Sequence, residues 1–257
     1  MALVDVHCHL DHPLIKDIKA VLKRAEESGV KEIITSGFDK ATNRKALELG
    51  KKFGVKVSLG LYPKDTLQKE YAETGQNFSD YDVDEEIEFI RKNKNSISAV
   101  GEAGLDFSGE NPDKNEQGKN FAKAIALSKE LKKPLIVHSR KAEKEVLAIL
   151  EEEKAEKVIM HCFCGGKNRV KEAAKKGYYF SIPANVNRSD NFQMIVKEVN
   201  INQLLTETDT PYMSPVKGEL SEPKDVKTAV QKIAEIKGFT KEETENNIFL
   251  NFINVFR

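Results

Sequence analysis

The sequence has no excess of charge of either sign. Lys and Arg together number 41, and Asp and Glu also number 41, so the formal net charge is zero. A protein that gathers nucleic acid through a broad positive field needs a marked basic excess, and this composition excludes that way of binding. An anionic substrate therefore has to be held by local features of a site.

Long apolar runs are also missing. None approaches the ~20 residues that cross a bilayer, and the first residues lead directly into a strand-like run with His and Asp, so we expect neither a membrane span nor a signal peptide. The three cysteines, Cys8, Cys162 and Cys164, are an odd number set within apolar runs. Their number and setting argue against a disulfide framework and favour a reducing, cytoplasmic location.

A regular alternation of short apolar runs and longer amphipathic stretches fills the chain. Stretches such as 15–29 have the helical spacing of apolar residues. Strands that alternate with helices are parallel, because each crossover needs a helix. Eight such strands in 257 residues predict a (β/α)8 TIM-like barrel, with a doubly wound open sheet as the alternative. The expected strands are residues 3–10, 31–38, 55–62, 97–107, 134–140, 157–163, 178–186 and 203–209.

No linker rich in Pro, Gly or Ser divides the chain, and no low-complexity block interrupts it. Residues 1–257 are therefore expected to form a single domain. The longest departure from the alternation is the polar stretch 64–86, which follows the third expected strand. We interpret it as a long loop with some helix, on the same side of the barrel as an active site.

Histidine is scarce, with five residues in the whole chain, yet most of it falls at the ends of expected strands. His7 and His9 are separated by one residue, so on a strand they share a face. Catalytic residues of such barrels lie at the carboxyl ends of the strands. His12, next to Pro13, is interpreted as a loop residue. The polar residues at these ends are His7, His9, Glu102, His138, His161 and Asp209.

Imidazoles and carboxylates in this number are typical ligands of divalent metals. One ion needs about three or four protein ligands, so six candidates indicate two ions that share a bridge. Glu102 is the best candidate for the bridge, because the two oxygens of a carboxylate can face two cations. Cys8 and Cys162 alternate with the histidines and are expected to point away from the site as core thiols. Cys164 has the parity of Cys162 but lies in a loop.

Five motifs come in the order and spacing of a known family. The sequence resembles the TatD family of metal-dependent hydrolases, in the amidohydrolase-like barrel superfamily, from residue 4 to the tail NNIFLNFINVF. Many members of that family are described as magnesium-dependent deoxyribonucleases. The motifs are DVHCHLD, GEAGLDF, VHSR, HCFCGG and ETDTPY.

The resemblance implies a distribution of the ligands. It implies that His7, His9 and Asp209 hold one metal, that His138 and His161 hold the second, and that Glu102 bridges them. Glu102 and Asp209 are also the expected catalytic residues: the metals lower the pKa of a water, and Asp209 accepts its proton. The native ion is Mg, Mn or Zn on this reasoning.

Further residues are expected to support the ligands or the substrate. Asp106 and Glu207 are expected to orient ligand side chains. Tyr62 stands in the sequence GLYP where the family usually has His, and Arg140 follows His138 by two residues; both are expected to contact a phosphate. The segment after ETDTPY has only Lys217 as a positive residue, where the family usually has an Arg-rich turn. The metal ligands therefore look complete, whereas the contacts to phosphate look fewer.

The expected substrate is a DNA end or a short single strand, with bases resting on rings such as Tyr62 or Phe107. No obligate protein partner and no membrane contact are expected. Two alternatives stay open. The same pair of metals can activate water against a carbonyl, as in an amidohydrolase or an aminoacyl-ester hydrolase that resembles D-aminoacyl-tRNA deacylases. A binding protein that has lost catalysis is the other alternative.

Overall fold

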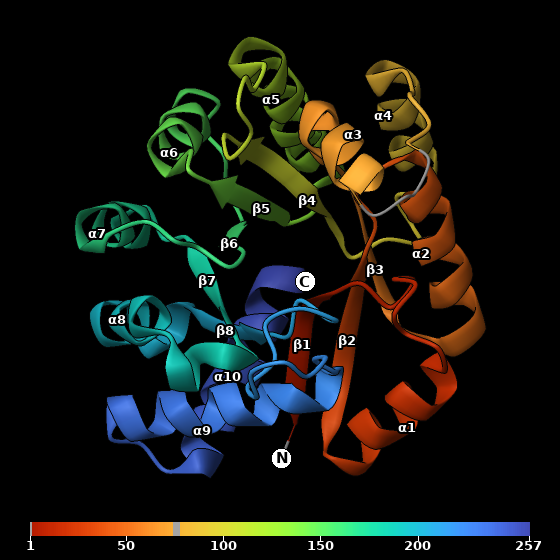
Figure 1. Cartoon of the computed structure of the whole chain (residues 1–257). Coiled ribbons are helices and arrows are strands. Elements are labelled where there is room, and N and C mark those ends of the chain that lie inside the picture. Colours follow the sequence, from red (N-terminus) through yellow and green to blue (C-terminus); the bar gives the residue numbers. More distant parts are fainter. Residues whose placement is uncertain (1, 74–77) are drawn as a thin grey trace.

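The computed structural model describes residues 2–73 and 78–257. One sheet of eight parallel strands forms its centre, and the strand order follows the chain from β1 to β8 (Figure 1). The strands are β1 (Leu3–Cys8), β2 (Val30–Ser36), β3 (Lys56–Leu61), β4 (Ala99–Asp106), β5 (Leu135–Arg140), β6 (Val158–Met160), β7 (Tyr179–Pro183) and β8 (Leu204–Glu207).

Backbone hydrogen bonds return from the end of the sheet to its beginning. The amide of Asp209 donates to the carbonyl of His7 at 2.9 Å, and the amide of His9 donates to the carbonyl of Thr210 at 2.9 Å. The first and last strands are therefore neighbours, and the sheet forms a nearly closed barrel. The predicted (β/α)8 barrel is confirmed, and the doubly wound open sheet is wrong.

Helices surround the barrel on its outside (Figure 1). Within the described ranges, no helix is both long and apolar enough to cross a bilayer. The α-helices are α1 (Ile18–Glu27), α2 (Lys40–Phe53), α3 (Lys64–Glu73), α4 (Val83–Lys92), α5 (Lys114–Leu131), α6 (Glu143–Glu152), α7 (Lys167–Lys175), α8 (Asp190–Glu198), α9 (Val226–Lys237) and α10 (Lys241–Phe256). Short 3-10 helices η1 (Ala184–Arg188), η2 (Ile201–Gln203) and η3 (Pro223–Asp225) complete the chain.

Local signals in the sequence fix where several helices begin and end. Helix α1 begins at Ile18 rather than at Ile15, because the Asp17 side chain accepts a hydrogen bond from the Ala20 amide at 3.0 Å. Helix α2 ends at Phe53 and is capped by Gly54, whose φ of +74° is the left-handed conformation that favours glycine. The polar stretch 64–86 contains α3 and the start of α4, as expected in part; residues 74–77 lie outside the described residues.

All strands except β5 end earlier than the sequence indicated, and three of these early ends concern ligand candidates. Strand β1 ends at Cys8, β6 at Met160 and β8 at Glu207. His9, His161 and Asp209 therefore lie just beyond the sheet instead of inside it. Because the chain leaves regular pairing there, these residues take side-chain directions that strand alternation does not dictate.

Apolar side chains fill the interior of the barrel and the layer between barrel and helices. Val4, Ile136 and Phe180 are fully buried, and each such side chain contributes roughly 1.5–3 kcal/mol relative to an exposed one.

Two glycines allow the backbones of β3, β4 and β5 to approach each other closely. A Cβ on Gly60 would lie 2.2 Å from the carbonyl oxygen of Glu102, and one on Gly104 would lie 1.9 Å from that of His138. These contacts hold β4 tightly between β3 and β5, and so fix where Glu102 and His138 stand.

Candidate metal centre

Four imidazoles and two carboxylates converge at the carboxyl ends of the strands. The Nε2 atoms of His7 and His9 are 3.2 Å apart. Asp209 Oδ1 lies 3.6 Å from His7 Nε2, 3.4 Å from His9 Nε2 and 3.9 Å from the Nε2 of His161. The chain thus brings residues at or just beyond the carboxyl ends of β1, β6 and β8 to within one ligand shell of each other.

The spacing fits a divalent cation. A metal bonded to nitrogen and oxygen at about 2.1 Å places neighbouring ligand atoms about 3.0–3.4 Å apart, depending on coordination number. The observed separations of 3.2, 3.4 and 3.6 Å among His7 Nε2, His9 Nε2 and Asp209 Oδ1 are close to that range. The distances among these three atoms need to shorten by only a few tenths of an ångström around an ion.

Glu102, from β4, faces imidazoles on both of its oxygens. Its Oε2 lies 3.3 Å from His7 Nε2 and 3.7 Å from His9 Nε2. Its Oε1 lies 2.8 Å from His138 Nδ1 and 3.8 Å from His161 Nε2. The carboxylate therefore lies between two pairs of histidines, one pair on each oxygen.

The second nitrogen of each imidazole is held by a fixed partner. Ser36 holds the first pair: its carbonyl oxygen is 3.0 Å from His9 Nδ1, and its hydroxyl is 3.1 Å from His7 Nδ1. His161 Nδ1 lies 2.7 Å from Glu207 Oε2, and His138 Nε2 lies 3.3 Å from Asp106 Oδ2. Such partners fix the ring orientation and leave the other nitrogen turned towards the ligand cluster.

Glu207 and Asp106 are buried and accept several hydrogen bonds each. Glu207 Oε2 also accepts from the Ser181 hydroxyl at 2.6 Å, while its Oε1 accepts from the Cys162 amide at 2.9 Å. Asp106 accepts from the Tyr62 hydroxyl at 2.9 Å on Oδ2 and from the Ser108 amide at 2.8 Å on Oδ1. Both carboxylates are therefore positioned by their surroundings before they contact histidine.

Electrostatics at the centre favour positive charge. Burial lowers the pKa of His9, but the hydrogen bond and the charge of Asp209 outweigh it and raise the pKa to about 9. Burial likewise opposes the charged form of His161, and the nearby Glu207 and Glu102 raise its pKa to about 10. Burial raises the pKa of Glu102, yet its contacts with His138 and His161 hold the pKa well below its usual value. The carboxylates thus attract protons onto imidazoles where a divalent cation would bind.

Tyr62 and Arg140 lie beside this cluster. The Tyr62 hydroxyl is 3.2 Å from His138 Nε2 as well as 2.9 Å from Asp106, so it contacts the residues that orient a ligand. Arg140 places Nη1 4.0 Å from Asp106 Oδ2, and its side chain is 59% exposed. The structure therefore groups Tyr62, Asp106, His138 and Arg140 on one side of the mouth.

The cysteines divide into two cases. Cys8 is fully buried and donates to the Ile34 carbonyl at 3.3 Å, on the side away from the ligands, as expected. The same expectation for Cys162 is wrong: its Sγ lies 4.0 Å from Asp209 Oδ2, and it belongs to a possible metal-binding group with His161 and Asp209. Cys162 has a φ of +41°, so strand parity does not apply to it. The neighbouring Cys164 is exposed and donates to the Cys162 carbonyl at 3.3 Å.

Several supporting residues were not found by sequence reasoning. Ser36 and Ser181 hold His7 and Glu207, and Asp5 accepts from Thr208 at 2.6 Å beneath the cluster. Their types are common on buried strands, and only their position at the end of an apolar run sets them apart. Contacts between neighbouring strands, which no local pattern records, give them their role.

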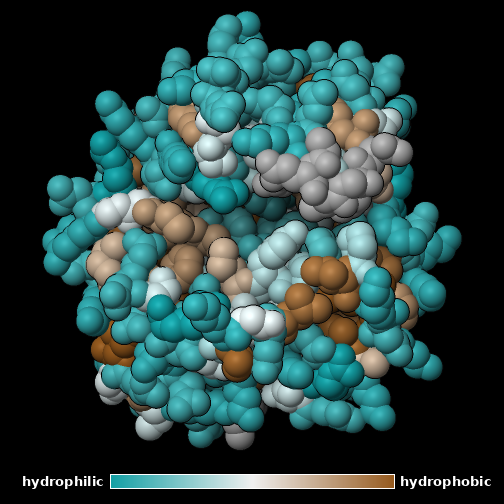
Figure 2. Space-filling view, viewed as in Figure 1, coloured by the Kyte–Doolittle hydropathy of each residue, from teal (hydrophilic) through white to brown (hydrophobic). Residues whose placement is uncertain are grey.

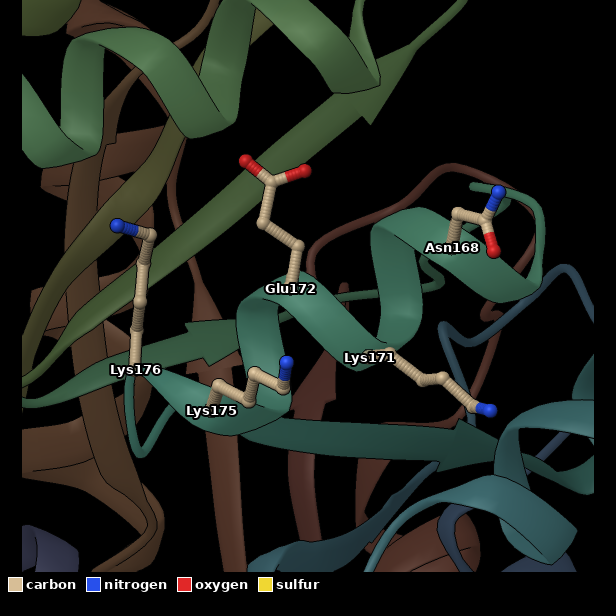
Figure 3. A pocket seen from close by; sticks show the side chains of 5 residues that line it. All are labelled: Asn168, Lys171, Glu172, Lys175 and Lys176. Atoms are coloured by element: carbon tan, nitrogen blue, oxygen red, sulfur yellow. The ribbon is translucent and has the colours of Figure 1, made fainter.

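A separate hollow lies on the outer surface at α7 (Figure 3). It is lined by Asn168, Lys171, Glu172, Lys175 and Lys176. Lys171 pairs with Glu198 at 3.4 Å and Lys176 with Glu151 at 2.9 Å, so acidic neighbours offset part of its positive charge. None of the six metal-ligand candidates lines this hollow, and it has no part in the chemistry of the mouth.

The barrel and its cluster of imidazoles and carboxylates define the class of metal-dependent barrel hydrolases. The chain matches the family described as TatD related DNase over residues 4–257, and it belongs to this family. It is 33% identical over 255 residues to the uncharacterized metal-dependent hydrolase MJ1582 of Methanocaldococcus jannaschii, covering 99% of this chain and 96% of that protein. It is 32% identical to human deoxyribonuclease TATDN3, covering 100% of this chain and 95% of that protein.

Solved structures show the same fold. YjjV, a TatD homologue from Escherichia coli K12, superposes with a TM-score of 0.88 at 24% identity, covering 99% of this chain and 97% of that chain. A TatD family hydrolase from Entamoeba histolytica gives a TM-score of 0.85 at 21% identity, covering 99% and 97%. At these identities the likeness concerns the fold, and the family match identifies the chain as a metal-dependent hydrolase.

Proposed function

We propose that this chain is a deoxyribonuclease that hydrolyses phosphodiester bonds with two divalent cations. The single observation that carries the proposal is Glu102, whose two oxygens each face a different pair of imidazoles. A carboxylate in that position is suited to bridge two ions. The relative named deoxyribonuclease TATDN3 supports DNA as the substrate.

The ligands divide by their geometry. His7, His9 and Asp209 form one compact group, and we assign them to the first ion. His138 and His161 stand near the other oxygen of Glu102, and we assign them to the second. Bound Mg²⁺, Mn²⁺ or Zn²⁺ supplies a Lewis acid and lowers the pKa of a coordinated water towards neutrality.

Residues of the chain perform the remaining tasks. Asp209 turns Oδ1 to the histidines and keeps Oδ2 beside the Cys162 thiol, where a carboxylate oxygen can accept a proton from the attacking water. Glu207 and Asp106 hold the rings of His161 and His138 in the ligating orientation. The exposed Arg140 guanidinium is suited to contact a phosphate oxygen at the mouth, and the Tyr62 hydroxyl acts mainly by positioning Asp106 and His138.

The substrate we propose is a DNA end or a short single strand. With a formal net charge of zero, the chain has no broad field to hold duplex DNA. Local contacts at the mouth suit a single phosphodiester and the nucleotides beside it. We expect no obligate protein partner for this reaction.

Metal removal tests the proposal directly. Protein stripped with a chelator should lose hydrolysis of a short single-stranded oligonucleotide and regain it with Mg²⁺, Mn²⁺ or Zn²⁺. Glu102→Gln should lower the rate about a hundredfold or more, since even residues behind the ligands typically cost ten- to a hundredfold. Glu26→Gln, an exposed substitution of the same chemistry on α1, serves as the matched control. Full activity of Glu102→Gln would refute the bridging role.

A substrate panel distinguishes hydrolysis of a phosphodiester bond from hydrolysis at a carbonyl. Cyclic amides and aminoacyl esters are assayed beside the oligonucleotide under the same metal loading. Faster turnover of a carbonyl substrate than of any oligonucleotide would assign the centre to the amidohydrolase chemistry instead. Failure to take up metal under any loading condition would overturn both the nuclease assignment and the amidohydrolase assignment.

A further inference from the structure

Exposed apolar side chains gather on two loops at the mouth of the barrel. In the described part of the chain, the large hydrophobic residues that are clearly exposed include Leu14 in the loop after β1, and Tyr212, Val216 and Leu220 in the loop after β8. Figure 2 shows apolar surface on the face that carries these loops in Figure 1. Most of the remaining surface in that view is polar, so this region is distinct from its surroundings.

Tyr212 is the aromatic member of this group, and it is held in place. Its hydroxyl lies 3.0 Å from His12 Nε2, and the two rings meet edge to face with centroids 5.4 Å apart. His12 is itself fixed, because its Nδ1 accepts from the Leu14 amide at 3.2 Å. An acceptor at Nδ1 leaves the proton of the neutral ring on Nε2, which then donates to the Tyr212 hydroxyl. Half of the Tyr212 surface, 52%, nevertheless remains exposed.

The position of Tyr212 relative to the centre is set by a tight turn. Its amide donates to the Asp209 carbonyl at 2.8 Å, three residues back along the chain. Such a turn brings the first and fourth Cα atoms within about 7 Å of each other. The backbone of Tyr212 therefore stands within about 7 Å of that of the ligand candidate Asp209, which is about the length of one nucleotide.

We propose that Tyr212, positioned by His12, is a stacking platform for an unpaired base next to the bond that is cut. This inference rests on the proposed function. Base stacking on an aromatic ring tolerates any sequence and needs no basic surface, which suits a mouth that has few cations after β8. Leu14, Val216 and Leu220 are further exposed apolar side chains on the same two loops. A base within a duplex is already stacked on its neighbours, so the platform favours frayed ends and single strands.

Other rings near the mouth suit this task less well. Phe107 is packed partly against the core, and Lys114 Nζ lies 4.8 Å from its ring centroid. Tyr62 is half-buried and tilted against the His138 ring, with centroids 4.6 Å apart. The expectation that bases rest on Tyr62 or Phe107 therefore gives way to Tyr212.

The test compares two oligonucleotides that differ only in the base. One is a short single strand with all of its bases, and the other carries abasic residues at both ends and next to them. The metal-loaded wild type should prefer the base-bearing strand by about tenfold in kcat/KM, mostly through KM. Tyr212→Leu should lose this preference, and Tyr212→Phe should keep most of it. Phe239→Leu is the matched control, because Phe239 is 40% exposed and follows the end of α9, where Lys237 donates to the Val199 carbonyl ahead of β8, at the amino end of that strand.

The outcomes separate the two proposals. Equal cleavage of both strands by wild type and by Tyr212→Leu overturns the platform while the nuclease proposal stands. An equal loss of kcat/KM on both strands in Tyr212→Leu overturns the platform as well, because the ring then only supports the loop. Unchanged metal affinity and melting temperature in Tyr212→Leu exclude damage to Asp209. A wild type that cleaves neither strand with Mg²⁺, Mn²⁺ or Zn²⁺ refutes both proposals.

Discussion

Glu207→Gln is the substitution for which the structure gives the sharpest expectation. The side chain is fully buried and keeps its size when the carboxylate becomes an amide. Three donors now point at the carboxylate: the Cys162 amide to Oε1, and the Ser181 hydroxyl and His161 Nδ1 to Oε2. Glutamine offers one acceptor oxygen and one NH₂ group, so it cannot accept from both sides.

Each orientation of the glutamine has a definite consequence. If its oxygen stays with the Cys162 amide, its NH₂ faces His161 Nδ1, and His161 must move its proton to Nε2 and lose the lone pair that faces the centre. If the amide is reversed, the buried Cys162 N–H is left without an acceptor, which costs about 1–3 kcal/mol. The expected result is a ten- to hundredfold loss of metal affinity, about 1.4–2.7 kcal/mol, with near-normal turnover at saturating metal.

The assay is metal titration by calorimetry together with activity as a function of metal concentration. Glu151→Gln is the matched control, since Glu151 is 66% exposed and pairs with Lys176 on the surface. Wild-type metal affinity in Glu207→Gln, at unchanged thermal stability, would refute the view that Glu207 fixes the ligating form of His161.

Three further predictions concern protons, a thiol and a buried ion pair. Because the pKa values of about 9 for His9 and about 10 for His161 lie above pH 7.5, both rings are protonated without metal. Metal binding at pH 7.5 should then release protons and weaken as pH falls; binding enthalpies that do not vary with the buffer's ionisation enthalpy would contradict this. Cys162→Ser should weaken Zn²⁺ binding more than Mg²⁺ binding, since thiols favour softer ions; parallel titrations showing equal changes would refute it. Arg44→Met should cost about 2 kcal/mol in urea unfolding, less than the ~3–5 kcal/mol for a fully buried pair, because Arg44 is partly exposed while its partner Glu86 is buried. An unfolding free energy equal to that of the wild type would show that Asn43, which donates to Glu86 at 2.8 Å, suffices alone.

The barrel was predictable because its signals are local and repeated. Each strand is a short apolar run, each helix has its own apolar stripe, and the parallel order follows from their alternation. The ligand candidates were predictable for a related reason. His7, Glu102 and His138 are polar residues at the ends of apolar strands, where this fold gathers functional groups.

The alternation of side-chain directions along a strand no longer predicts where a side chain points once the strand has ended. Cys162 was expected to point into the core by counting from His161, but its left-handed backbone turns the thiol towards Asp209. Tyr62 is expected to contact phosphate, and the structure adds that its hydroxyl contacts Asp106 and His138, which the sequence did not indicate. The left-handed backbone of Cys162 decides where its thiol points, and no periodic pattern records such an angle.

The sequence by itself determined the fold class and the residue types at the mouth, since both depend on hydrophobic spacing within short segments. Only the tertiary structure decided which partner holds each ring. Ser36 on β2 meets His7 on β1, and Glu207 on β8 meets His161 just beyond β6, with β7 between those two strands. His12 and Tyr212, two hundred residues apart, form one platform. The physical reason is that barrel closure brings β8 back to β1, and contacts made by closure depend on the positions of all eight strands at once.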